Sequence, residues 1–96
     1  MLVEIKKLNI SNDGYARSIS IDKVYINANH IISITDYEGV KTFLISEGAK
    51  QYKDQNFSLI KLNNIKGTED VIAVGTSQEI FETFSSHTKN KELLNG

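Results

Sequence analysis

Cysteine and proline are both missing from this chain of 96 residues. Without cysteine, the chain itself supplies no disulfide, no thiolate ligand for zinc or an iron–sulfur cluster, and no cysteine nucleophile. The same absence fits a reducing compartment. Because proline is absent, glycine and asparagine must mark the turns. The sequence therefore predicts a fold that depends on its hydrophobic core, with no metal and no cofactor.

An excess of charge of one sign and long apolar runs are missing as well. The formal net charge is -1, so no overall field attracts nucleic acid or an anionic membrane. No stretch approaches the roughly 20 apolar residues that span a bilayer. The first ten residues, MLVEIKKLNI, lack the apolar centre of a signal peptide. We therefore expect a soluble, cytoplasmic protein that does not bind membranes.

Apolar residues alternate with polar ones in two N-terminal segments, Val3–Ile10 and Ile19–Ile26. The turn signal Asn12-Asp13-Gly14 lies between them. This pattern predicts an antiparallel hairpin. The alternation in the second segment breaks at Asp22-Lys23, where we expect a bulge.

The first strand, Leu2–Ile10, is expected at an edge of the sheet. Lys6 and Lys7 would protect that edge, because charged side chains discourage pairing with other chains. A core this small also gains stability from additional burial. We therefore expect a homo-oligomer.

The middle of the chain is less regular. Asn27–His30 is expected to form a polar corner, followed by a strand from Ile31 to about Tyr37. Glu38-Gly39 is predicted as a turn and Thr42–Ser46 as a strand. The polar segment Glu47–Asn56 is predicted as an exposed, mobile loop.

Two further strands are predicted, one beginning at Phe57 and one at Val71–Val74, with a turn region at Asn63–Asp70 between them. After Gly75, the pattern changes to helical spacing. Thr76 with Glu79 three residues later matches a capping box. The side chains expected to be largely buried are Ile26, Ile34, Leu59, Val74, Ile80, Phe81 and Phe84.

These elements predict an α+β fold, in which a curved antiparallel sheet carries one C-terminal α-helix. A barrel of the Sm-like or SH3-like type is the open alternative. Residues 1–88 are expected to form a single domain and residues 89–96 a flexible tail.

The run Lys23–Ile34 resembles the opening of the small FlbD-like proteins, in which a strand ending in Tyr-x-Asn turns into a second strand with an Ile-x-x-Ile pattern. Phe57–Leu62 and Val71–Phe84 resemble the closing strand–strand–helix of that family. The family includes flagellar-operon proteins and stand-alone phage or mobile-element proteins. The resemblance implies a binding or regulatory module and no catalytic residues. The N-terminal hairpin and an insertion at about 38–56 depart from the family pattern.

Few residues suggest chemistry. His30 and His87 are the only histidines, are far apart in sequence, and have no ligand spacing typical of zinc. Gly75, Thr76 and Ser77 follow a strand and open a helix, where backbone N–H groups can bind an anion. Helix capping alone also explains Thr76.

Lys50, Tyr52 and Lys53 combine charge with an aromatic ring in the predicted loop, and we expect them to bind a partner. The sequence thus favours a non-enzymatic protein-interaction or regulatory module, encoded by a phage or mobile element. The alternative is a domain that binds single-stranded nucleic acid through the same loop, by stacking and phosphate contacts. A solvated loop without a binding role is a third interpretation.

Overall fold

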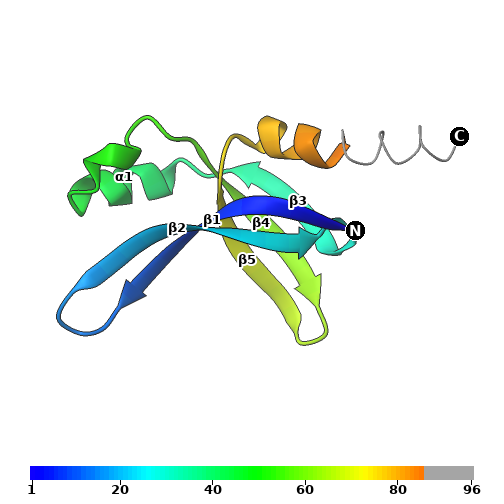
Figure 1. Cartoon of the computed structure of the whole chain (residues 1–96), viewed down its shortest axis with the longest axis horizontal. Coiled ribbons are helices and arrows are strands. Elements are labelled where there is room, and N and C mark those ends of the chain that lie inside the picture. The colour runs from blue at the N-terminus through cyan, green and yellow to red at the C-terminus, as the bar shows by residue number, and fades with distance from the viewer. Residues whose placement is uncertain (86–96) are drawn as a thin grey trace, which may run out of the picture.

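A computed structural model of the chain describes residues 1–85 (Figure 1). Its five strands form one antiparallel sheet in the order β2-β1-β5-β4-β3. The strands are β1 (Leu2–Asn12), β2 (Arg17–Asn27), β3 (Ile31–Asp36), β4 (Phe57–Asn64) and β5 (Gly67–Val74). Two short 3-10 helices, η1 (Ala28–His30) and η2 (Lys50–Tyr52), and the helix α1 (Gly39–Ser46) connect them. A C-terminal helix follows, described over residues 77–85.

The predicted N-terminal hairpin is confirmed. Asn12 and Asp13 hold its turn with their side chains, which accept hydrogen bonds from the backbone N–H groups of Gly14, Tyr15 and Ala16. Gly14 has a φ of +93°, a conformation that favours glycine. These local bonds fix the register of β1 and β2 from Leu2↔Asn27 to Asn12↔Arg17.

The expected bulge at Asp22-Lys23 is absent, because the register of β1 and β2 runs without a shift. The apolar alternation breaks at paired positions of the two strands, because the two ends of the hairpin bury opposite faces. Val3 and Ile5 are buried in one core cluster, whereas Leu8 is buried in another. Between them, Lys7 aligns with Ala73 of β5, the only register pair between β1 and β5.

The strand expected at an edge, β1, lies inside the sheet, between β2 and β5. That prediction was wrong because the alternation pattern reveals which face of a strand is buried but not its place in the strand order. In the described part of the chain, the edges are β2 and β3, each paired with a single strand. The register between β3 and β4 shifts between Ile31 and Ser33, so the bulge of this sheet lies in β3.

The predicted strand Thr42–Ser46 is wrong, because these residues form the second half of α1. Phe43 and Ile45 had suggested a period of two, but Val40 and Leu44 are the buried residues of the segment. A spacing of four places side chains on the same face of a helix. Glu38 is the N-cap of α1 and Gly39 its first residue, rather than a separate turn.

Two clusters of buried residues lie on opposite faces of the sheet. Along β5, which alternates between faces, Val71 and Ala73 belong to the first cluster, while Ile72 and Val74 pack against the second. The C-terminal helix covers the first cluster with Ile80 and Phe84. The second cluster is covered by α1 and the residues after it: its members are Leu8, Val40, Leu44, Ala49 and Phe57. In Figure 1, α1 lies at the upper left and the C-terminal helix, in orange, at the upper right.

The C-terminal helix begins with the predicted capping box. The Glu79 N–H donates to Thr76 Oγ1 over 3.1 Å, and the Thr76 N–H donates to Glu79 Oε1 over 3.3 Å. Of the side chains expected in the core, Ile80 and Phe84 are buried, and Phe81 is 61% exposed. The other four are half-buried: Ile26, Ile34, Leu59 and Val74. A helix buries one face only, and Ile80 and Phe84 occupy that face.

The α+β prediction is confirmed, with one helix more than expected. The sheet is open rather than a barrel, since β2 and β3 do not pair with each other. The turn predicted at Asn63–Asp70 is much shorter, because β4 continues to Asn64 and β5 begins at Gly67.

His87 and the predicted tail 89–96 lie outside the described residues. In the part that is described, no helix has the length and apolar character needed to cross a membrane.

Phe84 and Phe81 offer a matched test of this packing, since they lie one turn apart on the same helix. We expect Phe84→Ala to lower the free energy of unfolding by about 3–5 kcal/mol, because its ring is 9% exposed in the first cluster. Phe81→Ala should cost less than about 1 kcal/mol. Denaturant titration at low protein concentration measures both values. Equal effects would show that the helix presents a different face to the sheet.

Candidate functional site

The polar centre of the structure lies where β5 passes into the C-terminal helix. Ser58, the only polar residue that is buried in the described part of the chain, donates its hydroxyl proton to the Gly75 carbonyl over 2.7 Å. The Gly75 N–H donates in turn to the Asn56 carbonyl, also over 2.7 Å. Both backbone groups of Gly75 are therefore fixed by the start of β4.

Gly75 itself has a φ of +121°, which side chains other than hydrogen rarely allow. The chain uses this conformation to leave the sheet and start the helix. A Cβ atom at this position would lie 3.5 Å from Ile80 Cγ1, an ordinary contact. The requirement for glycine is therefore one of backbone conformation rather than of space.

Asp36, the last residue of β3, joins this junction from the opposite side. Its Oδ1 accepts a hydrogen bond of 2.8 Å from the Ser77 N–H, at the first turn of the C-terminal helix. This backbone hydrogen bond, with a second one from the Ser77 side chain, holds the pKa of Asp36 below its ordinary value of 3.8. The carboxylate also suits the positive end of the helix dipole. The Asp36 carboxylate thus occupies the N-terminus of the C-terminal helix.

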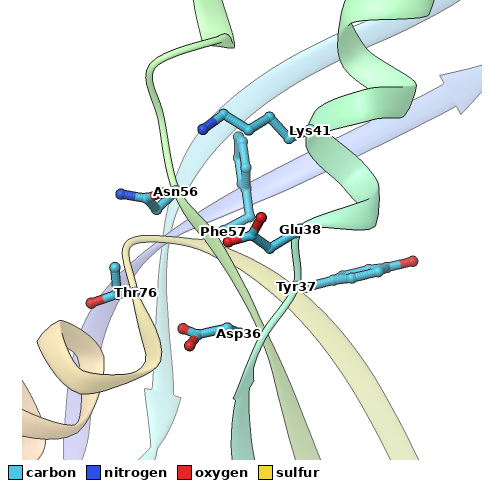
Figure 2. Close-up of a pocket in the computed structure, with 7 residues that line it drawn as sticks. All are labelled: Asp36, Tyr37, Glu38, Lys41, Asn56, Phe57 and Thr76. Atoms are coloured by element: carbon cyan, nitrogen blue, oxygen red, sulfur yellow. The ribbon is translucent and has the colours of Figure 1, made fainter.

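A small pocket of about 80 Å³ lies beside this junction (Figure 2). The carboxylates of Asp36 and Glu38 point to the same side of it, toward the connection that carries Thr76, whereas the Tyr37 ring projects away. Lys41 extends from α1 alongside Phe57. The residues that line it are Asp36, Tyr37, Glu38, Lys41, Asn56, Phe57 and Thr76.

This pocket is much smaller than the roughly 300–1,000 Å³ of typical ligand-binding clefts. Of the two carboxylates that line it, Asp36 already binds the Ser77 N–H. Within residues 1–85, no group of three histidine, aspartate or glutamate side chains could hold a metal ion. His30 lies exposed in η1. The pocket is best explained as a structural junction.

The three residues predicted to bind a partner lie at η2 and directly after it. Lys50 and Lys53 are exposed, as expected. Tyr52 is half-buried, because its ring packs against the second cluster. Its expected availability as an exposed anchor was therefore wrong: the preceding helix α1, which the sequence had not suggested, brings apolar neighbours to it. The binding role of these residues stays a prediction.

The proposed anion site at Gly75, Thr76 and Ser77 is surrounded by internal partners. The N–H groups of all three residues donate to Asn56, Glu79 and Asp36, respectively. An external anion would have to replace at least one of these acceptors. Anion binding here stays a prediction, but the structure provides its own anion.

A larger hollow, of about 430 Å³, lies between β3 and the C-terminal helix. We call it the β3 groove; its lining residues are Ile31, Ile32, Ser33, Ile34, Ser77, Gln78 and Phe81. None of them is charged. Ile32 is 53% exposed and Phe81 is 61% exposed, so two large apolar side chains face solvent beside an edge strand.

Sequence reasoning missed this groove, although a signal for it exists. Ile31-Ile32 and Ile80-Phe81 are both pairs of adjacent apolar residues. Neighbouring residues in a strand point to opposite faces, and neighbours on a helix differ by about 100°. On the helix, Phe81 therefore lies off the face that Ile80 buries, and on β3 Ile32 lies exposed while Ile31 packs against the first cluster. Their meeting at one groove depends on the packing of helix against sheet, which no local pattern encodes.

Comparisons of the chain with protein-family models, with curated proteins and with solved structures give no match. The resemblance to FlbD-like proteins therefore stays a prediction.

The Asp36–Ser77 bond predicts a specific titration. The pKa of Asp36 should lie below 3.8 and should return toward that value in Ser77→Pro, which removes the N–H yet fits the first position of a helix. Ser77→Ala keeps the N–H and should keep most of the shift. NMR of the carboxyl carbon measures all three values. An equal pKa in all three proteins would contradict the bond.

Because this pKa is lower in the folded chain than in the unfolded chain, ionised Asp36 stabilises the fold above about pH 4. The stabilisation is lost as the pH falls through the folded-state pKa. Asp36→Asn should therefore show a weaker loss of stability on acidification than the wild type, measured by thermal unfolding at a series of pH values.

Thr76→Ala should lower the free energy of unfolding by about 1 kcal/mol, because it removes the acceptor for the Glu79 N–H. Thr76→Asp should be nearly neutral, since aspartate is also a good N-cap. Chemical denaturation measures both. Strong destabilisation by Thr76→Asp, together with full stability of Thr76→Ala, would instead favour an external anion at this helix start.

Proposed function

We propose that the chain is a non-enzymatic protein-interaction or regulatory module that binds its partner at the β3 groove. The observation that carries this proposal is the grouping of Ile32 and Phe81 on an uncharged surface next to a strand edge. Single exposed apolar residues are ordinary, but grouped ones are typical of interaction sites. The FlbD-like resemblance and an origin in a phage or mobile element agree with such a role and belong to the same proposal.

The chemistry of the described residues supports binding over catalysis. The pocket at the junction is small, and one of the two acids that line it, Asp36, is engaged at the start of the C-terminal helix. The β3 groove has hydroxyl and amide groups from two serines and a glutamine, but no titratable side chain. A groove of this composition suits apolar side chains of another protein, with a few polar groups to orient them.

The rival function, binding of single-stranded nucleic acid by the Lys50–Lys53 loop, has weaker support. Stacking needs an accessible aromatic face, and Tyr52 packs against the second cluster. Lys50 and Lys53 supply charge only. The interaction proposal is therefore preferred.

Affinity capture with the tagged full chain tests the proposal. We expect proteins captured by the wild type to be lost with Phe81→Glu, which places a charge in the groove without disturbing the core. Ile65→Glu is the matched control, because Ile65 is fully exposed at the β4–β5 turn, outside the groove. Quantitative mass spectrometry compares the three samples.

Partners that Phe81→Glu captures as well as the wild type does would contradict the proposed site. Salt-sensitive binding of a labelled oligonucleotide that disappears in a Lys50→Ala/Lys53→Ala variant would favour the rival function instead.

A further inference from the structure

We propose that the occupant of the β3 groove is the same groove of a second copy of this chain, so that the protein forms a two-fold symmetric dimer through β3 and the C-terminal helix. This inference rests on the proposed function and names its partner. A two-fold interface uses one surface twice, so the surface must complement itself.

The first requirement is an apolar centre that gains from burial. Ile32 and Phe81 are both outside the two core clusters and both more than half exposed. Ile31 and Ile34 lie beside them, partly buried against the first cluster. Aromatic side chains at the centre of an interface contribute a large share of binding energy, and Phe81 holds that place.

The second requirement is the absence of charge that would repel an identical surface. Residues 31–35 of β3 carry no charge. The other edge, β2, carries Arg17, Asp22 and Lys23, which discourage pairing at that edge. Two copies of an uncharged groove can therefore meet without like-charge repulsion.

Asp36 is the only charged residue of β3. Its carboxylate already binds the Ser77 N–H of its own subunit. In an antiparallel pair of residues 33–36, the two Asp36 residues lie at opposite ends, about 10 Å apart along the strands. Neither carboxylate therefore faces the other.

The bulge in β3 decides how the copies meet. The register shift between Ile31 and Ser33 interrupts the regular strand at Ile32, so regular strand pairing is confined to residues 33–36. Phe81 and Ile32 then contribute most of the binding, and the backbone of residues 33–36 sets the orientation. Tyr15 and Ile65 are also exposed, but each stands alone at a hairpin turn. Leu2 and Tyr25 are exposed neighbours on the β1–β2 hairpin, beside the charged Glu4 that accepts from the Tyr25 hydroxyl.

Sedimentation equilibrium of the full chain tests the dimer. We expect a dimer at about 100 µM and a dissociation constant at least about tenfold higher for Ile32→Lys and Phe81→Lys. Ile65→Lys carries the same added charge on a fully exposed site and should dimerise like the wild type. Unchanged melting of each variant at low concentration shows that folding is intact.

Hydrogen exchange locates the interface independently. Backbone amides of residues 32–36 should exchange more slowly at high than at low protein concentration, whereas amides of β2 should not change. A monomeric wild type at 100 µM, or a dimer that both groove variants retain, overturns this inference. Partner capture that depends on Phe81, found together with a monomeric wild type, would leave the proposed function standing and refute the dimer alone.

Discussion

The arrangement of this small protein depends on the buried hydrogen bond from the Ser58 hydroxyl to the Gly75 carbonyl. It holds the end of β5 against the start of β4 at the point where the chain leaves the sheet in a conformation suited to glycine. The C-terminal helix then begins in the one place from which Ile80 and Phe84 reach the first cluster. A hydrogen bond of this kind contributes about 0.5–1.5 kcal/mol to stability, so loss of the hydroxyl would weaken both the turn and the helix that follows it.

The second constraint is the change of buried face along the N-terminal hairpin. The helix α1 and the described part of the C-terminal helix are each about two turns long, and the chain places one on each face of the sheet. The hairpin meets this arrangement by burying Val3 and Ile5 toward the C-terminal helix and Leu8 toward α1. The strand β1 crosses β5 at Lys7↔Ala73, and the buried face of the hairpin changes there without a bulge. Two separate clusters, rather than one, therefore stabilise the fold.

Local patterns predicted what local forces determine. The Asn12-Asp13-Gly14 turn, the polar corner before β3 and the capping box at Thr76 follow from side chains that bond to nearby backbone, and all three are confirmed. The failures share a different cause. The face switch was read as a bulge, α1 as a strand, β1 as an edge and Phe81 as core, because each depends on which distant element packs there. The Asp36–Ser77 contact joins residues 41 positions apart in the chain, and no sequence spacing indicated it.

The β3 groove follows from the same packing. The C-terminal helix is fixed at its start by Thr76, Glu79 and Asp36 and along one face by Ile80 and Phe84, so its rotation about its own axis is determined. That rotation leaves Phe81 on the side of β3, where the bulge displaces Ile32. Folding alone gains little from either side chain, since both remain more than half exposed. Their apolar surface is worth about 25 cal/mol per Å² only when another molecule removes it from water. The groove is thus held in place by interactions that do not include its two exposed residues, Ile32 and Phe81, which is the arrangement expected of a preformed binding surface.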